Sequence, residues 1–522
     1  MRFNILIGGK AGQGINELAG ILARSFGREG FYVFNYRDYG SFITGGHNFN
    51  ILCLSDKKIG SFDYRYDLVL ALDKETLEIH KEGFHKNTLF IVNFPTDKEN
   101  FIFLNANKDK TENMAFASAV FKLLCLQKTS LLDEVKKRFF GKSLLDRDVD
   151  LIEHFYTKDY GREIKLPHEK INKIVFNGAE GVSKGAELSG LDVYFGYPMT
   201  PATTLLNFLA KKQDKFFFTF TLEDEIACAN AAIGASFAGA RAMVGTSGGG
   251  FDLMTEAISL QGMTELPFVI YLAQRPGPST GVPTYSGQQD LLVALFGGHG
   301  EFSRVVIAPG NAKECIEKTN EAFYLAEKFG VLSIILTDKN IAESDFSFNE
   351  FKIKELKIPE RKDKPGMPNL VFKRTSYEHD FEWNNTEEIE NIKNSFEKRL
   401  AKIEALEKET KKFEMYKTYG KGKDLVIGWG STKGPILDAL ENLDIKFLQI
   451  LYLSPFPREI IGLIKNAKNV FVLENNATSQ LSKLIAQNTG YIVEEKNKIL
   501  KFDGRPFTPQ EIISELKKRG VK

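Results

Sequence analysis

Four short segments between residues 191 and 284 combine reactive side chains with turns rich in glycine and proline. In the first, LDVYFGYPMTPATT, a strand-like stretch is followed by Thr200 and Pro201. These residue types are preferred at a helix N-cap and at the first helical position. We therefore expect Thr200 to cap a helix at the carboxyl edge of a sheet, where open α/β sheets bind ligands. A capping threonine with no further role is the alternative.

The second segment, TLEDEIACANAAIGASFAGAR, places Glu223 and Glu225 at the start of a helix made mostly of small residues. Acids in a first turn complement the helix dipole, which is one explanation for them. The alanines and glycines allow close packing, so we expect the helix over 225–240 to lie at a domain or subunit interface. A carboxylate at the mouth of that interface could meet a ligand held between two domains.

The third and fourth segments also change from strand to turn. In RAMVGTSGGGFDLMTE, the glycines Gly248 to Gly250 let the backbone approach a ligand or a facing chain. In FVIYLAQRPGPSTGVPT, a strand ends at Arg275, which suits a carboxylate or a phosphate, with a surface salt bridge as the alternative. Four such segments on one sheet edge predict a site more strongly than any one of them.

The elements around these segments predict an α/β fold with three α/β domains. Strand-like stretches at 3–7, 31–34, 51–54, 68–72 and 89–92 alternate with helical patterns, which indicates a parallel layer. We expect domains over 1–155, 173–342 and 421–522. Residues 156–172 are expected to form a linker, and residues 343–420 a second linker with a charged helical arm.

Composition excludes several classes of protein. The 522 residues include 69 basic and 68 acidic side chains, a balance that predicts no nucleic-acid partner. The sequence shows no apolar run near the ~20 residues that span a bilayer and no signal peptide, so we expect a cytoplasmic protein without membrane contact. The four cysteines, Cys53, Cys125, Cys228 and Cys315, are far apart in sequence. They predict lone buried thiols rather than a zinc or iron–sulfur site, and we expect no metal on this chain.

The same motifs carry a family resemblance. YPMTPATT, EDEIACANAAIGASFAGARAM, TSGGGFDLMTE and RPGPSTGVPT resemble the α subunit of 2-oxoacid:ferredoxin oxidoreductases, especially the 2-oxoglutarate type. GGKAGQGINELAGILA with YGSFITGGHN resembles the γ domain of the family, and TSYEHDFEW its inter-domain linker. IGWGSTKGPI, LYLSPFP and LENNATSQLSKLI resemble its transketolase-C-terminal-like domain. The resemblance implies, in order, a γ-like domain, a thiamine-diphosphate pyrimidine-binding domain and a transketolase-C-terminal-like domain.

The resemblance also implies cofactors and partners. In this family thiamine diphosphate is shared with a separate β subunit, which holds the diphosphate, Mg²⁺ and a [4Fe–4S] cluster. The present sequence agrees, because it has neither a cysteine cluster nor a GDG motif followed by an asparagine pair. The implied reaction is oxidative decarboxylation of a 2-oxoacid, with 2-oxoglutarate or a broad range favoured, to acyl-CoA and CO₂. Coenzyme A is then a co-substrate, and ferredoxin accepts the electrons.

Individual residues match the motifs of the family. Glu225 matches the glutamate that contacts the pyrimidine N1′ of the cofactor and so assists its deprotonation, with Glu223 as the less favoured alternative. Thr200 matches a threonine that binds the 2-oxoacid, and Arg275 matches an arginine that pairs with a substrate carboxylate. The match places the cofactor beside Tyr197, Pro198, Gly248 and Gly249, and a coenzyme A region at Gly12, Gly14, Gly45 and Gly46.

Some positions depart from the family and leave alternatives open. Ala11 stands where the usual GGQG has its first glycine, and Thr44 stands where arginine precedes Gly-Gly-His, so the coenzyme A role is in question. The glycines at 9, 12 and 14 also allow a nicotinamide-dependent oxidoreductase with Asp38 on the ribose, although the spacing is not that of the dinucleotide fingerprint. A non-catalytic scaffold subunit is the other alternative, and the presence of Thr200, Glu225 and Arg275 together argues against it.

Overall fold

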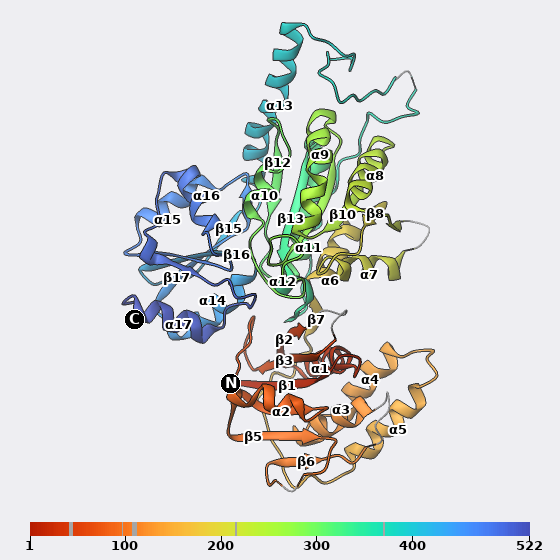
Figure 1. The fold of residues 1–522 in the computed structure, drawn as a ribbon, viewed down its shortest axis with the longest axis vertical. Helices are drawn as coiled ribbons and strands as arrows, with labels where there is room; N and C mark the ends of the chain where they lie inside the picture. The colour runs from red at the N-terminus through yellow and green to blue at the C-terminus, as the bar shows by residue number, and fades with distance from the viewer. Residues whose placement is uncertain (41–44, 97, 107–111, 214–216, 369–370) are drawn as a thin grey trace. The chain divides into compact units, whose positions relative to one another are not determined.

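The computed structural model describes residues 1–522 except 41–44, 97, 107–111, 214–216 and 369–370. The described chain divides into two compact units (Figure 1). The first unit comprises Met1–Asn177, Ser344–Lys352 and Thr508–Gln510, and the second comprises Gly178–Glu343, Ile353–Phe507 and Glu511–Lys522.

The first unit contains an eight-stranded mixed sheet. In spatial order its strands are β6 (Phe101–Phe103), β5 (Phe84–Val92), β4 (Tyr66–Ala71), β1 (Arg2–Lys10), β3 (His47–Ser55), β2 (Tyr32–Tyr39), β14 (Asp345–Phe348) and β7 (Ile174–Asn177). The parallel layer predicted for this region is therefore wrong in part: β1 runs parallel to β4 but antiparallel to β3, and β2 is antiparallel to β3. Too few residues separate Tyr39 from His47 for the crossover that parallel neighbours need.

Helices of this unit bury apolar faces around the sheet. They are α1 (Ile15–Glu29), α2 (Glu75–Ile79), α3 (Glu112–Leu123), α4 (Lys128–Arg138) and α5 (Leu145–Tyr156). In α1, Leu18, Leu22 and Phe26 recur at helical spacing and are fully buried. The stretch after α5, predicted as a linker, lies on this core: the Ile164 N–H donates to the Leu123 carbonyl at 2.8 Å.

Two strands of the first sheet come from regions assigned in the sequence to other parts of the chain. Ile174–Asn177, expected to open the second domain, and Asp345–Phe348, expected in the second linker, pair antiparallel with each other. Asp345–Phe348 pairs in addition with β2, where the rings of Phe34 and Phe346 lie 5.1 Å apart. The apolar side chains of β14 thus extend the first sheet rather than an exposed linker.

The second unit contains a seven-stranded central sheet and a five-stranded sheet. In spatial order the central sheet comprises β18 (Tyr452–Ser454), β12 (Arg304–Ile307), β13 (Leu332–Asp338), β11 (Phe268–Gln274), β10 (Ala242–Thr246), β8 (Val193–Gly196) and β9 (Phe218–Thr221). Only β18 pairs antiparallel among these described strands. The associated helices are α6 (Gly178–Leu188), α7 (Thr203–Lys212), α8 (Glu225–Phe237), α9 (Gly248–Thr264), α10 (Leu291–Phe296), α11 (Ala312–Phe329) and α12 (Lys339–Glu343).

The C-terminal sheet has the order β15 (Tyr416–Gly420), β17 (Ile445–Ile450), β16 (Asp424–Trp429), β19 (Val470–Glu474) and β20 (Lys498–Leu500). Its helices are α14 (Lys433–Ala439), α15 (Ile461–Lys465), α16 (Gln480–Thr489) and α17 (Pro509–Lys518). The sheet begins at β15, slightly before the expected boundary at residue 421. One hydrophobic core connects both sheets, since Trp429 and Leu448 belong to the same buried cluster as Val244 and Phe251.

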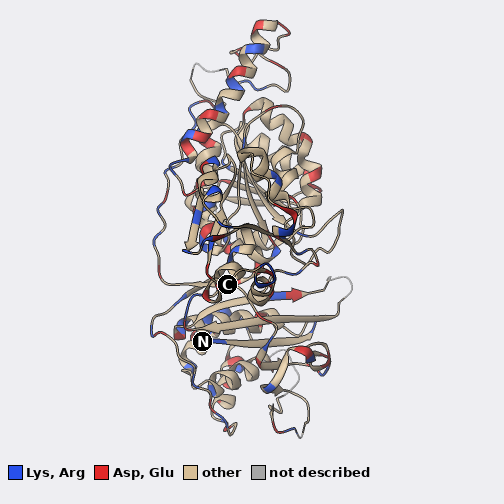
Figure 2. Ribbon diagram, turned by 90° about the vertical axis from the view of Figure 1, so that its left-hand side faces the viewer, with Lys and Arg blue, Asp and Glu red and all other residues tan. Residues whose placement is uncertain are grey.

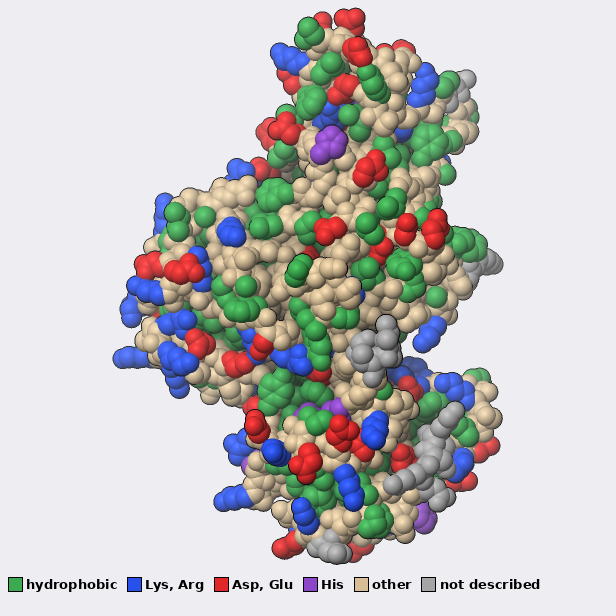
Figure 3. All heavy atoms as spheres, viewed as in Figure 1, with side chains coloured by type: hydrophobic (Ala, Val, Ile, Leu, Met, Phe, Trp, Pro, Cys, Tyr) green, Lys and Arg blue, Asp and Glu red, His purple; other side chains and the backbone are tan. Residues whose placement is uncertain are grey.

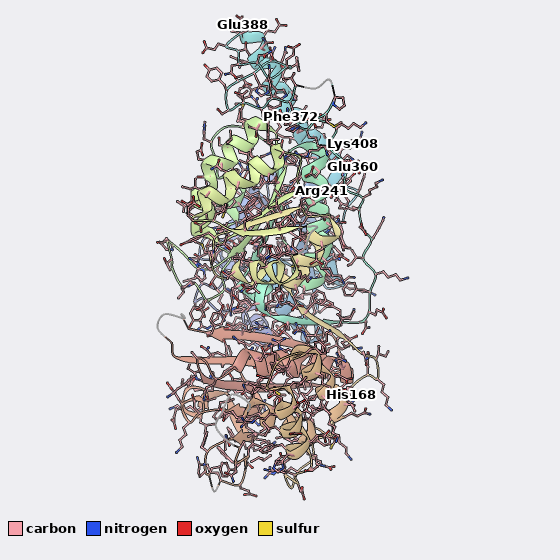
Figure 4. All side chains as sticks on the ribbon, turned by 90° about the vertical axis from the view of Figure 1, so that its right-hand side faces the viewer. His168, Arg241, Glu360, Phe372, Glu388 and Lys408 are labelled. Atoms are coloured by element: carbon pink, nitrogen blue, oxygen red, sulfur yellow. The ribbon has the colours of Figure 1, made fainter. Side chains whose placement is uncertain are left out.

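The charged run in the second predicted linker forms the helical arm that its sequence predicts, α13 (Ile389–Thr410). Acidic and basic residues are interspersed along it (Figure 2). Glu388 lies at its free end and Lys408 close to the body of the unit (Figure 4). Arg399 forms a bidentate ion pair with Glu378, with N–O distances of 3.0 and 2.7 Å, which fixes the preceding segment on the arm.

Cysteine placement agrees with the expectation at three of four positions. Cys53, Cys228 and Cys315 are buried and free, but Cys125 is exposed. Charged side chains of both signs are interspersed over the face seen in Figure 3. Among the described residues, we find no helix that is both long and apolar enough to cross a membrane.

Candidate functional site

The four segments singled out in the sequence meet at one edge of the central sheet. Strands β11, β10, β8 and β9 are neighbours in that order and run parallel. Their carboxyl ends therefore lie side by side, and each leads into one of the segments. The sequence prediction that these segments share a sheet edge is confirmed.

Thr200 lies at this edge but does not cap the next helix. The helix begins at Thr203, with Ala202 at the N-cap, so the prediction of a Thr200 cap with Pro201 at the first helical position is wrong. An N-cap carbonyl normally accepts the first hydrogen bond of its helix. The Thr200 carbonyl instead accepts a hydrogen bond from Nη1 of Arg275 at 2.8 Å. The half-buried Thr200 hydroxyl is thus not committed to a helix cap.

Arg275 connects the ends of β8 and β11. It follows Gln274 directly, and its bond to Thr200 joins two segments that are far apart in sequence. Its Nε is buried without a hydrogen-bond partner among the described residues. Burial lowers the pKa of the guanidinium, while the nearby charges of Asp290 and Glu225 act to raise it. The group therefore retains a donor for a further acceptor.

Glu225 is the first residue of α8, directly after the N-cap Asp224, whose carboxylate accepts the Ala227 N–H at 2.7 Å. The Glu225 side chain is only 2% exposed, and its Oε1 has no hydrogen-bond partner in the described part of the chain. Burial raises the pKa of this carboxyl group. Glu223, the alternative, is exposed. An unpaired buried carboxyl costs free energy unless a ligand supplies its partner, which favours Glu225 as the functional acid.

The glycine turn before α9 brings backbone close to these side chains. A Cβ atom on Gly250 would overlap Glu225, and one on Gly248 would lie 2.6 Å from the Asp290 Oδ2. Gly249 has open space, with the nearest atom, the Ser279 carbonyl oxygen, 3.6 Å from such a Cβ. The Ser247 hydroxyl is buried here without a partner among the described groups. The glycines thus make room for two carboxyl groups.

Asp290 is the site residue that sequence reasoning missed. It occupies the N-cap of α10, and an aspartate in that position suggests only a cap. Its side chain, however, makes no capping hydrogen bond, and its Oδ2 is buried without a partner among the described residues. Burial raises the pKa of the Asp290 carboxyl group to about 7.

Exposed apolar side chains lie on the elements that form this edge. Tyr197 is 40% exposed, and Pro198 beside it is also exposed. The set comprises Tyr197, Phe218, Phe220, Ile226, Leu253 and Val282, and we call it the apolar rim. On α8 the exposed positions Ile226, Asn230 and Gly234 follow at intervals of four, and Gly234 has open space above it. Exposed aromatic and aliphatic groups in this number mark an interaction surface.

The first unit contains a separate hollow of about 830 Å³. Gly12 and Gly14 lie in its wall, in the turn between β1 and α1, and the Ala11 N–H donates to the Gly46 carbonyl at 2.9 Å. The turns at Gly12–Gly14 and Gly45–Gly46 are therefore neighbours. Thr44, the departure from the arginine of the family, lies outside the described residues. The other lining residues are Lys10, Gln13, Glu17, Leu72, Asp73, Lys74, Phe94, Glu112, Asn113 and Phe139.

The first sheet does not have the arrangement that a nicotinamide site requires. Such sites place an acid at the end of the strand next to the first strand in a parallel sheet. Here β3 separates β2 from β1, and β2 is antiparallel to β3. Asp38 on β2 is buried and accepts a hydrogen bond from the Tyr36 hydroxyl at 3.0 Å. The geometry disfavours the nicotinamide alternative.

Two family models match the chain. Residues 4–157 match "Pyruvate ferredoxin/flavodoxin oxidoreductase", and residues 184–414 match "Pyruvate flavodoxin/ferredoxin oxidoreductase, thiamine diP-bdg". The second match contains Thr200, Glu225, Arg275 and Asp290. The first contains the hollow with Gly12 and Gly14.

Individual relatives match over most of their length. A 2-oxoacid:ferredoxin oxidoreductase subunit alpha from Sulfolobus sp is 28% identical, with 99% of this chain and 96% of that protein covered. The 2-oxoglutarate synthase subunit KorA of Archaeoglobus fulgidus is 32% identical, with 58% of this chain and 88% of that protein covered. Among solved structures, the 2-oxoglutarate:ferredoxin oxidoreductase from Magnetococcus marinus, with 2-oxoglutarate, coenzyme A and succinyl-CoA bound, superposes with a TM-score of 0.86. It is 26% identical and covers 99% of both chains.

Proposed function

The chain belongs to the α-subunit family of the 2-oxoacid:ferredoxin oxidoreductases, and we propose that it converts 2-oxoglutarate, together with a β subunit, to an acyl-CoA and CO₂. Support for this substrate comes from the solved structure of the relative from Magnetococcus marinus, which has 2-oxoglutarate, coenzyme A and succinyl-CoA bound. The Archaeoglobus relative is also named for 2-oxoglutarate. The observation that carries the proposal is the buried carboxyl group of Glu225, whose Oε1 lacks a hydrogen-bond partner among the described residues, in a domain of the thiamine-diphosphate-binding family.

The site fits the pyrimidine end of thiamine diphosphate. When bound, this cofactor supplies the carbanion chemistry of the decarboxylation. A ring nitrogen needs one hydrogen-bond partner from the protein, and the Glu225 Oε1 lacks one among the described residues. The raised pKa of Glu225 favours a protonated carboxyl that can donate to such a nitrogen. Tyr197, Pro198, Gly248 and Gly249 are the neighbours we assign to the same ring.

Thr200 and Arg275 are assigned to the 2-oxoacid. The guanidinium can pair with a carboxylate through its free donors, and the Thr200 carbonyl holds its Nη1 in place. The Thr200 hydroxyl, on the same residue, can donate to the 2-oxo group. A positive group and a hydroxyl donor side by side match a 2-oxoacid, whose keto oxygen and carboxylate are adjacent.

We assign the remaining parts of the reaction to partners. The apolar rim and the small exposed face of α8 are the surface on which a β subunit would close the site. That subunit would bring the diphosphate site with its Mg²⁺ and a [4Fe–4S] cluster, from which electrons pass to ferredoxin. The hollow beside Gly12 and Gly14 is assigned to coenzyme A, because Lys10 and Lys74 can pair with phosphates and Phe94 can stack on a base.

The test is anaerobic co-expression with a β subunit, followed by dye reduction. The purified complex should reduce a viologen with 2-oxoglutarate, coenzyme A and thiamine diphosphate present, and this chain alone should not. Pyruvate and branched-chain 2-oxoacids serve as competing substrates. Reduction with pyruvate but not 2-oxoglutarate would overturn the substrate assignment. If the complex forms but fails to reduce the dye with every 2-oxoacid tested, the non-catalytic scaffold becomes the favoured role for this chain.

A further inference from the structure

The Asp290 side chain is not placed to cap α10 but packs against the glycine turn before α9. Its carboxyl group packs against Gly248, with Oδ2 and Oδ1 at 2.6 and 2.8 Å from the place a Cβ would take, so that only glycine leaves room for it. The Gln274 Oε1 accepts the Asp290 N–H at 2.9 Å. Because Gln274 immediately precedes Arg275, this bond holds the Asp290 backbone next to the end of β11.

Two charged groups act on the Asp290 carboxyl. Arg275 lies close enough to lower its pKa, and Asp252 on α9 raises it. The structure gives no ion pair between Arg275 and either Asp290 or Glu225, although all three residues are described. Both carboxyl groups nevertheless act on the guanidinium. Asp290 and Arg275 thus interact electrostatically without forming an ion pair. The Asp290 Oδ2 and the Arg275 Nε both lack hydrogen-bond partners among the described groups.

On the basis of the function proposed above, we propose that Asp290 is a positioning residue for Arg275, and that it takes up a proton when the substrate carboxylate pairs with the guanidinium. In the resting protein the Asp290 carboxylate offsets part of the Arg275 charge. The incoming carboxylate then takes that charge, and a proton from solvent neutralises Asp290 at Oδ2, so the net charge of the site is conserved. No covalent bond changes in this step.

The surroundings of Asp290 determine in which direction substrate binding changes the pKa of its carboxyl group. Burial already raises its pKa to about 7, so the group is partly protonated at neutral pH. The negative charge of the substrate carboxylate raises that pKa further. The pKa also rises because the guanidinium, once paired with the substrate, stabilises the Asp290 carboxylate less. Substrate binding should then be coupled to uptake of about half a proton at pH 7, and affinity should fall as the pH rises above 7, by up to about tenfold per unit.

Isothermal titration calorimetry of the α–β complex tests this inference. The complex is loaded with thiamine thiazolone diphosphate, which cannot react, and titrated with 2-oxoglutarate at pH 7 in phosphate and in Tris. The difference in binding enthalpy between the buffers gives the number of protons taken up. We expect about half a proton for the unaltered complex and none for Asp290→Asn. The control is Glu256→Gln, which removes an exposed carboxylate from α9, the helix that also contains Asp252. This variant should keep the proton uptake.

The steady-state pH profile gives a second readout. The KM for 2-oxoglutarate should rise above pH 7 in the unaltered complex and stay flat in Asp290→Asn, with kcat changed far less than KM. Proton uptake that is absent from the unaltered complex, or equal in Asp290→Asn, would overturn the inference while leaving the proposed function intact. If the unaltered complex neither binds nor oxidises any 2-oxoacid, the proposed function fails and this inference fails with it.

Discussion

Gly250 lies directly against Glu225, so closely that any side chain at position 250 would overlap the Glu225 carboxyl group. The same Cβ would lie 2.2 Å from the Thr246 hydroxyl oxygen, so the Thr246 and Glu225 side chains would both have to move. Gly462, an exposed glycine on α15, has open space around it and is not among the residues assigned to the site. Gly250 and Gly462 therefore make a matched pair for testing whether the position of the Glu225 carboxyl matters.

Gly250→Ala should displace the Glu225 carboxyl and lower kcat of the complex by about 10- to 100-fold, because a shift near 1 Å at a reacting group has that effect. Gly462→Ala should leave kcat within about twofold and raise helix stability slightly, since alanine has a higher helix propensity than glycine. The measurement is viologen reduction alongside thermal unfolding of both variants. Equal activity of the two would show that the carboxyl position is not critical.

Glu225→Gln should separate activity from stability. The substitution removes the carboxyl that we assign to the cofactor and should cost at least about 100-fold in kcat. Burial raises the pKa of Glu225, so its ionised form destabilises the fold at pH values above the ordinary glutamate pKa. Glutamine carries no charge there, and the unfolding temperature at pH 7 should therefore stay the same or rise.

Glu223→Gln is the control for that experiment, since Glu223 is exposed at the same helix start. It should retain near-normal kcat. A large loss in Glu223→Gln with full activity in Glu225→Gln would reverse our choice between the two acids.

The convergence of the site was predictable from the sequence because it follows from local patterns. Each of the four segments contains a strand ending in a turn, and parallel strands bring such turns to one edge. The helical character of α13 was also predictable, since its charge pattern lies within one continuous stretch.

Features that depend on distant partners were not predictable in this way. Thr200 loses its role as a cap because its carbonyl accepts a hydrogen bond from Arg275, 75 residues away. The strands β7 and β14, which pair with each other, are separated in sequence by the length of a whole domain. No local sequence pattern indicates such a pairing. Asp290 resembles an ordinary cap until the structure shows its side chain against Gly248.

The hollow of the first unit gives a prediction about coenzyme A. Lys74→Ala should raise the KM for coenzyme A by about 10- to 100-fold, because a charged hydrogen bond contributes about 1.5–3 kcal/mol. The KM for 2-oxoglutarate should not change. Lys86→Ala, an exposed lysine of the same unit outside the hollow, is the matched control. If Lys74→Ala leaves the KM for coenzyme A unchanged, that co-substrate binds elsewhere.

A buried ion pair between Glu314 on α11 and Lys433 on α14 joins the central and C-terminal parts of the second unit. Gln449 and the Gly310 N–H each donate to the other oxygen of Glu314 at 2.8 Å. Burial alone would raise the pKa of this carboxyl, but Lys433 and its other partners hold it at about 2. The carboxylate is thus ionised at neutral pH and depends on Lys433.

Lys433→Met should destabilise the second unit by about 3–5 kcal/mol, because it leaves a buried charge uncompensated. Denaturant unfolding at pH 7 measures the loss, and Lys433→Met combined with Glu314→Gln should recover most of it. Lys393→Met breaks an ion pair with Glu397 whose partners are 73% and 64% exposed, and it should cost less than about 1 kcal/mol. The Glu314 carboxylate contributes its full stability above the ordinary glutamate pKa and loses it as the pH falls toward about 2. The cost of Lys433→Met should therefore shrink in acid, and a cost that is independent of pH would show that lost packing, not charge, dominates.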